Sequence, residues 1–314
     1  MTDNVRLAVA GVGNNTSALA QGINLYRRTG SRVGLNRPLI DGIGVGDVDF
    51  VAAFAVSDAK VGRDLHEAIL IPPNNYPRLD GELPPAGVTV RRGLTDATGI
   101  DAVAAAVKDA EVLLYSAPSG HPGIARAYAE AALRAGVAFI NSTADPVARD
   151  PELLARFEAA GLPLLGDDLA SQFGTSALHP ALLRLLADRG LTLVSSYQVN
   201  LGGTEDFRNL VERPETKKRS KLNALGADDR VQVAPLGYLS QLGSRKVAHI
   251  NIEARGWAGS TVSVDLKLEA DDPAGGAGVN IDLIRFAAGA LRSGRGGFLP
   301  EAVTLLKSPP GTAT

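Results

Sequence analysis

A glycine-containing turn near the N-terminus restricts the fold of this chain more than any other feature. Residues 5–10 form an apolar run typical of a buried strand, Gly11-Val12-Gly13 follows directly, and residues 18–28 have helical spacing. A strand that turns on glycines into a helix is a phosphate-binding device. The first helical N–H groups face the anion, and the glycines allow it to come close. The sequence therefore predicts a dinucleotide site in the first turn of an α/β domain.

Glycine motifs of this kind also occur at ordinary tight turns that bind no ligand. In addition, two positions depart from the usual dinucleotide-binding pattern. Near the place of the third glycine stand Thr16 and Ser17, small hydroxyl residues that can donate to a phosphate. Where a carboxylate normally binds the ribose after the second strand, the chain has Ala55. Ser57 or Asp58 can substitute for that carboxylate; otherwise only backbone and water hold the ribose.

Helical stretches alternate with short apolar strands over the first two thirds of the chain, which predicts a doubly wound parallel sheet. At 314 residues and 45% hydrophobic content, the chain can form one large domain or two linked ones around a sizeable core. The predicted strands are 5–10, 48–56, 88–90, 112–115, 137–140, 162–165 and 192–199, and the predicted helices are 18–28, 60–68, 101–108, 123–135, 151–160 and 175–189.

The pattern changes near residue 200. Two helical stretches, 204–213 and 215–225, precede two alternating runs, 247–255 and 260–269, which are typical of an antiparallel, half-exposed sheet. Helical spacing then returns at residues 277–292 and 300–307. We therefore expect a second domain, inserted or appended, that begins at about residue 200.

Composition excludes several classes of function. A net charge of −2 gives no general attraction to nucleic acid or to an anionic membrane. The absence of cysteine excludes disulfides, thiolate nucleophiles and cysteine-based zinc sites. The four histidines lack metal-ligand spacing, so no metal is expected. No apolar run reaches the roughly 18 residues of a membrane helix and no signal-peptide pattern is seen, so we expect a soluble cytoplasmic protein.

Lysines are few, and their placement is informative. Only eight of the 32 basic residues are lysines, yet three of them fall within residues 216–221. Lys217 and Lys221 are four apart and share one helix face. Like charges on one face favour an anion between them, and a buried ammonium, unlike a guanidinium, can lose its proton. The alternative is a solvated basic face.

A pair of acids follows the predicted strand at 162–165. Gly166-Asp167-Asp168 stands at the carboxyl edge of the sheet, where ligands bind in such folds. Acids at this edge can hold water, a cation or a ligand hydroxyl. The alternative is that Asp168 caps the next helix.

Together these motifs resemble the myo-inositol-1-phosphate synthase family, in its short prokaryotic branch, from Val5 to Pro310. The order of the motifs along the chain is specific. The matching segments are the nucleotide loop Gly11-Val12-Gly13-Asn14-Asn15, the pair Asn74-Asn75, the strand end Ser116-Ala117, Gly166-Asp167-Asp168 with Ser171, Asn200-Leu201-Gly202-Gly203, the lysines at 217, 221, 246 and 307, and Asp271-Asp272-Pro273.

The resemblance implies an α/β fold with a discontinuous Rossmann domain. Residues 1–199 would bind NAD, 200–276 would form an inserted α+β catalytic and oligomerisation domain, and 277–314 would return to the first domain. It also implies catalytic roles for Lys217, Lys221, Lys246 and Lys307. The implied cofactor contacts are Gly11, Gly13, Asn14, Asn15, Thr16, Ser116, Ala117, Asp168 and Asp271, and the implied substrate contacts are Ser171, Asn200, Gly203 and Thr204.

The reaction implied by the resemblance is redox-neutral. The family oxidises C5 of glucose 6-phosphate, deprotonates C6, closes the ring onto C1 by an aldol step, and reduces the resulting ketone with the same NADH. Fixed ammonium groups in a dry site stabilise both phosphate and developing oxyanions, and a lysine of depressed pKa can transfer protons. The implied partners are a hexose 6-phosphate and other copies of the chain in a homotetramer, with no nucleic acid or membrane.

Several positions depart from the family pattern. Ala55 replaces the ribose-side acid, Ala170 replaces a lysine, and Thr204 replaces an asparagine. Relatives in natural-product pathways close a five-membered ring from fructose 6-phosphate, and this chain is a candidate for that reaction. Two further alternatives are a net dehydrogenase of a phosphorylated substrate and a non-catalytic NAD-binding protein.

Overall fold

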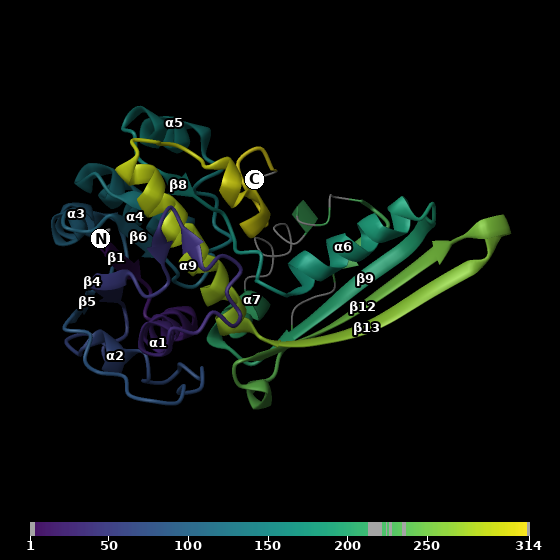
Figure 1. The fold of residues 1–314 in the computed structure, drawn as a ribbon, viewed down its shortest axis with the longest axis horizontal. Coiled ribbons are helices and arrows are strands. Elements are labelled where there is room, and N and C mark those ends of the chain that lie inside the picture. The colour runs from purple at the N-terminus through teal and green to yellow at the C-terminus, as the bar shows by residue number, and fades with distance from the viewer. Residues whose placement is uncertain (1–3, 213–221, 224, 226–227, 234–236, 313–314) are drawn as a thin grey trace.

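The computed structural model describes residues 4–212, 222–223, 225, 228–233 and 237–312 (Figure 1). Its first sheet has six parallel strands, which confirms the predicted doubly wound α/β fold. The strand order is β5 (Val90–Arg92), β4 (Val48–Ala55), β1 (Val5–Ala10), β6 (Val112–Tyr115), β7 (Ala138–Asn141) and β8 (Leu164–Leu165). A small hairpin, β2 (Leu39–Ile40) with β3 (Ile43–Gly44), lies apart from this sheet.

Helices cover both faces of this sheet, because all of its strands except the edge strand β5 are largely apolar on both sides. On one face, α1 (Asn14–Thr29) and α9 (Asp272–Arg292) pack in one core cluster with β1, β6 and β7. On the other face, α3 (Ile100–Val107), α4 (Pro122–Ala135) and α5 (Pro151–Ala159) form a second cluster. The short elements on this unit are α2 (Leu65–Ala68), η1 (Ala97–Gly99) and η4 (Pro300–Leu305).

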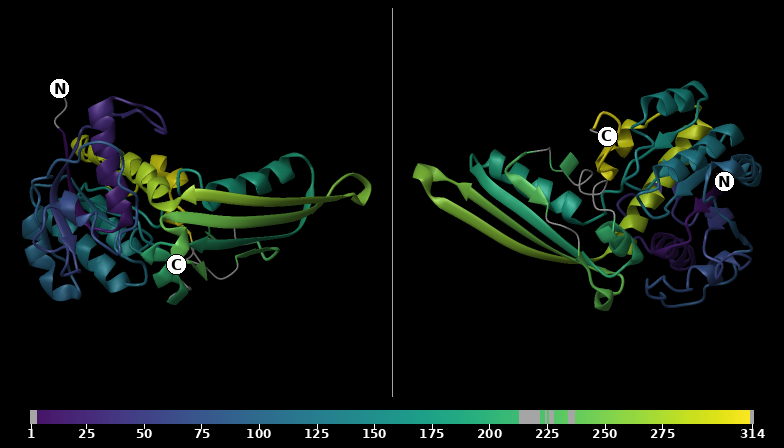
Figure 2. Two further views of the ribbon diagram at one scale, coloured as in Figure 1. Left: turned by 90° about the horizontal axis from the view of Figure 1, so that it is seen from below. Right: turned by 180° about the vertical axis from the view of Figure 1, so that it is seen from behind.

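The second sheet extends from the first unit as a long arm (Figures 1 and 2). Its path is β10 (Val231–Val233), β9 (Thr192–Gly202), β12 (Arg245–Arg255) and β13 (Thr261–Asp271), with β11 (Gly237–Tyr238) also on β9. The three long strands are antiparallel, as the alternating runs predicted. Helix α6 (Thr175–Asp188) lies along one face, and α7 (Glu205–Glu212) lies at the junction with the first unit. Two 3₁₀ turns, η2 (Ser240–Leu242) and η3 (Trp257–Gly259), flank β12.

Several sequence predictions need correction. The strand at 192–199 does not complete the first sheet; as β9 it pairs with β12, because its alternating burial suits a half-exposed antiparallel ladder. The expected boundary at residue 199 therefore falls inside β9. The helix expected at 60–68 begins only after Asp64, whose carboxylate caps it. The helix expected at 277–292 begins at Asp272, after the capping residue Asp271, and the one at 300–307 is the 3₁₀ helix η4.

The helix expected at 215–225 falls largely outside the described residues, as do Lys217 and Lys221. In the described part of the chain, no helix is both long enough and apolar enough to cross a membrane.

Candidate active site

A cavity of about 370 Å³ lies where the carboxyl edge of the first sheet meets the second unit. One wall is the glycine loop with the ends of β4 and β6, and the other includes Thr204, Phe207 and Lys246. Parallel α/β sheets bind ligands at this edge. Of the residues expected at the site, those that line the cavity are Gly11, Gly13, Asn14, Asn15, Ser116, Ala117, Asp168, Ser171, Thr204, Lys246 and Lys307.

The glycine loop has the geometry of a close backbone approach. Gly11 has φ 108°, and a Cβ there would lie 2.7 Å from backbone atoms of Ser116 and Ala117, so only glycine fits. Thr16 is buried and donates to the carbonyl of Gly11 over 2.6 Å. The Thr16 hydroxyl thus stabilises the loop conformation. Thr16 does not line the cavity, although the sequence suggested that its hydroxyl could donate to a phosphate.

Two asparagines tie the loop to the rest of the first unit. The Asn14 side-chain oxygen accepts from the backbone N–H groups of Asn75 and Tyr76 at 2.8 and 2.9 Å. The Asn15 oxygen accepts from Asn280 of α9 at 2.6 Å, and Asn280 in turn accepts from Ser142 at 2.8 Å. These contacts fix the helix N-terminus of α1 relative to the cavity before any ligand arrives.

Two lysines from distant segments reach the cavity, each paired with an acid. The Lys246 Nζ lies 3.1 Å from the Asp272 carboxylate and 5.7 Å from the Phe207 ring centroid. The Lys307 Nζ lies 3.0 Å from the Asp168 carboxylate, and both side chains are nearly buried. Asp168 is thus a lysine partner and does not cap α6, which begins after Gly174. Paired in this way, the ammonium groups are held in fixed positions along the cavity wall.

A third lysine, which sequence reasoning did not single out, lies under the glycine loop. Lys60 is 4% exposed, lines the cavity, and donates to the Val12 carbonyl at 2.7 Å and to the Asn74 side chain at 2.8 Å. Burial lowers the pKa of Lys60 to about 8. In the sequence, only the small number of lysines pointed to Lys60. Because residues 60–68 have helical spacing, the sequence predicts that Lys60 is part of a helix and does not single it out as a site residue.

Four of the expected site residues that the structure describes do not line the cavity: Thr16, Asn200, Gly203 and Asp271. The Asp271 carboxylate caps α9 and accepts a hydrogen bond from Ser244 at 2.5 Å, while its neighbour Asp272 lines the cavity. The Gly203 carbonyl accepts from Asn75 at 3.0 Å, and the Asn200 amide is buried beside Thr175. These residues position the wall, and sequence spacing alone does not separate them from residues that face a ligand.

The geometry fits a polar ligand at the junction of the two units. The Thr204 hydroxyl is buried, belongs to a cavity-lining residue and has no hydrogen-bond partner within the described structure. Buried hydroxyls are nearly always hydrogen-bonded, so this atom awaits a ligand or water. The glycine loop, the α1 N-terminus without a side-chain cap and the buried cations also suit a dinucleotide phosphate. Among the described residues, no group of acids or histidines is placed to hold a metal ion.

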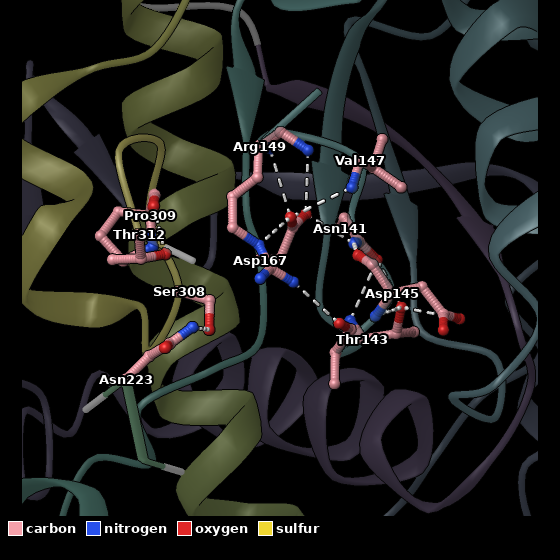
Figure 3. Close-up of polar contacts among 12 residues, drawn as sticks. Asn141, Thr143, Asp145, Val147, Arg149, Asp167, Asn223, Ser308, Pro309 and Thr312 are labelled. Atoms are coloured by element: carbon pink, nitrogen blue, oxygen red, sulfur yellow. Dashed lines mark hydrogen bonds and ion pairs between the residues drawn. The ribbon is translucent and has the colours of Figure 1, made fainter. Parts of the chain in front are cut away.

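A buried hydrogen-bond network connects the ends of β7 and β8 (Figure 3). Asp167 is fully buried and accepts from Asn141 at 2.7 Å, from the Ala148 N–H at 2.9 Å and from Arg149 at 3.1 Å. Its burial raises the pKa of this carboxyl. Asp145 accepts from the backbone of residues 120 and 121 at 2.9 and 3.1 Å. Of the two predicted acids, Asp167 is therefore structural and Asp168 faces the cavity.

Comparison with known proteins agrees with this geometry. The family model described as myo-inositol-1-phosphate synthase matches residues 174–273. The inositol-3-phosphate synthase of Mycolicibacterium smegmatis is 38% identical over 98% of this chain and 93% of its own length. The chain belongs to the inositol-3-phosphate synthase family. The family member from Corynebacterium glutamicum is 35% identical over 98% of this chain and 94% of its own length.

A solved structure extends the comparison. The crystal structure of Ari2 superposes with a TM-score of 0.90 at 53% sequence identity, and covers 99% of this chain and 94% of its own. Membership of the inositol-3-phosphate synthase family indicates an enzyme of the isomerase-type cyclase class. The resemblance deduced from the motifs is thereby confirmed.

Proposed function

We propose that this chain is an NAD-dependent cyclase that converts a hexose 6-phosphate into a carbocyclic phosphate without net oxidation. The observation that carries the proposal is a single cavity that joins the glycine loop at Gly11 to the ammonium groups of Lys246 and Lys307. The first feature suits a dinucleotide, and the second suits a substrate that carries phosphate and develops an oxyanion.

The residues of the chain have distinct parts in this proposal. When bound, NAD supplies reversible hydride exchange with the sugar. Gly11, Gly13 and the N-terminus of α1 would hold its pyrophosphate, since these residues line the cavity and the first N–H groups of a helix have no intrahelical partner. Lys246 and Lys307 would hold the sugar phosphate and the oxygen that gains charge during C–C bond formation.

Lys217 and Lys221 are proposed as further catalytic lysines. Both lie outside the described residues. The described residue Asn223 donates to the Ser308 hydroxyl at 3.3 Å, and Ser308 follows Lys307 directly (Figure 3). The chain therefore passes beside Lys307 two positions after Lys221, which supports a shared lysine-lined site.

Glucose 6-phosphate is the first candidate substrate, with an inositol phosphate as product, since the named relatives are inositol-3-phosphate synthases. Fructose 6-phosphate, closed to a five-membered carbocycle, is the second candidate. One observation favours keeping it: Thr204 lines the cavity where the family pattern has asparagine, and a changed side chain at the site alters which sugar is recognised.

The test is a product assay. The protein is incubated with NAD and either ¹³C-labelled hexose 6-phosphate, and the products are resolved by NMR. We expect a new C–C bond from one of the two sugars without accumulation of NADH. Stoichiometric NADH would indicate a net dehydrogenase instead, and no carbocycle from either sugar would refute the cyclase.

We also propose that the chain assembles as a homotetramer through the arm. Helix α6 packs on β9 and β12, while the row Val262, Val264, Leu266 and Leu268 of the edge strand β13 stays half-exposed. An apolar groove runs beside this row between α6 and β13, and includes Leu185 and Val264. Exposed apolar rows of this kind mark interfaces, and a second copy of the chain would cover both the row and the groove.

A further inference from the structure

The end of β4 is the place where a dinucleotide of this fold class presents its adenosine ribose. Residues Ala55, Val56 and Ser57 line the cavity at this end, together with Gly93 and Leu94 from the segment after β5. None of these side chains carries a charge. A carboxylate at position 55 would bind the ribose hydroxyls and repel a phosphate there, and Ala55 does neither.

A cation lies next to this uncharged end of the cavity. Arg92 of β5 is the register partner of Ala55 in the parallel pair of β4 and β5, so both side chains leave the sheet on the same face. The Arg92 guanidinium donates to the Val56 carbonyl at 2.7 Å and pairs with Asp58. It therefore lies at the rim beside the position of the absent acid.

The acid nearest to Arg92 does not block this rim. The Asp58 side chain is 91% exposed, and that of Arg92 is 54% exposed. Ion pairs this open to water are weak, so a phosphate can replace Asp58 as a partner of Arg92. A second cation, the buried Lys60 ammonium, also lines the cavity, where it donates to the Val12 carbonyl of the glycine loop. The local field thus favours an additional anion.

We propose that this end of the cavity accepts a phosphate on the adenosine ribose, so that the chain binds NADP more tightly than NAD. With Ala55 in place of an acid, no carboxylate at this position repels the phosphate, and the Arg92 guanidinium can pair with it. An arginine near this position accommodates the 2′-phosphate in NADP-binding domains. The inference rests on the dinucleotide site of the proposed function and changes which dinucleotide fills it.

The test uses nucleotides that lack nicotinamide, so that binding is separated from chemistry. Isothermal titration of the full chain compares adenosine 2′,5′-bisphosphate with adenosine 5′-monophosphate. We expect the bisphosphate to bind at least about tenfold more tightly, because a charge-assisted contact to Arg92 is added. Titration of NADP and NAD should give the same order.

Substitutions at positions 55 and 92 test whether the preference for the bisphosphate arises at this end of the cavity. Arg92→Ala should abolish the preference for the bisphosphate, whereas Arg91→Ala, the neighbour on the opposite face of β5, should keep it. Ala55→Asp removes no existing contact and should reverse the preference through repulsion. Both results would localise the phosphate to the side chains of Ala55 and Arg92.

The outcomes separate this inference from the proposed function. Equal affinity for the two nucleotides, or a preference that Arg92→Ala and Ala55→Asp leave intact, would overturn the inference. A carbocyclic product formed with NAD would still support the cyclase in that case. If no adenine nucleotide bound at all, the dinucleotide site and the cyclase proposal would fall together with it.

Discussion

The environment of Lys60 makes the stability of the chain depend on pH. Its pKa falls from 10.5 to about 8 on folding, because burial disfavours the ammonium. The folded chain then binds fewer protons than the unfolded chain between these values, so the free energy of unfolding rises with pH in that window. Below pH 8 both states are protonated and the cost of burying the charge is complete.

Lys60→Met should remove this rise. We expect the difference in unfolding free energy between the unliganded native chain and the variant to change by about 2 kcal/mol from pH 7 to pH 10. Urea unfolding at the two pH values measures it, and other titrating groups cancel in the difference. Lys108→Met, at an exposed lysine, is the control. Identical pH profiles for the native chain and Lys60→Met would contradict the prediction.

Lys246 should act in turnover and not in nucleotide binding. The loss of one preorganised cation at a developing oxyanion typically costs about 10²–10³ in kcat. Lys246→Met should therefore lower the rate of carbocycle formation by about this factor, while titration of adenine nucleotide stays unchanged. Lys267→Met, at an exposed lysine of β13, is the matched control. A variant with normal turnover would exclude Lys246 from the proposed site.

Among the elements, helix α9 joins the end of the chain to its beginning. Arg285 of α9 is fully buried, pairs with Asp282 at 2.6 Å and donates to the carbonyls of Arg37, Pro38 and Ile43. One guanidinium thus fixes the segment that follows α1 against α9.

Arg285→Met should lower the free energy of unfolding by about 3–5 kcal/mol, because it leaves the Asp282 charge and several carbonyls buried with fewer donors. Arg295→Met breaks an exposed pair with Glu301 and should cost at most about 1 kcal/mol. Denaturant unfolding of the two variants side by side measures the contrast. Similar losses in both would show that the Arg285 contacts are not stabilising.

The arrangement of helices and strands could be predicted from the sequence only in part. Local patterns determine the strands and turns of the first sheet, and Gly11 marks its ligand edge because its backbone conformation excludes other residues. Lys246 and Lys307 were found through the resemblance. Which sheet β9 joins depends on a partner, β12, more than forty residues away, and no local pattern reports that pairing.

Burial of single side chains was equally hidden in the sequence. Lys60 lies inside because its ammonium meets the carbonyl of Val12, a contact that no spacing rule predicts. Adjacent acids at 167 and 168 likewise have opposite roles, one in a buried network and one on the cavity.

For the whole molecule, the arm should determine assembly. Leu266→Glu places a charge in the half-exposed apolar row of β13 and should shift the proposed tetramer towards smaller species. Lys267→Glu points to the opposite face of the same strand and should leave the assembly unchanged. Analytical ultracentrifugation measures both. A native chain that is monomeric at micromolar concentration would contradict the proposed assembly.

The central claim is that the hydride taken from the sugar returns to the same molecule. The most direct measurement follows a hexose 6-phosphate deuterated at C5, incubated with the protein and unlabelled dinucleotide, by mass spectrometry and NMR. We predict a carbocyclic phosphate that keeps the full deuterium content, with no reduced dinucleotide released. Loss of deuterium from the product, or its accumulation on free reduced dinucleotide, would contradict the claim.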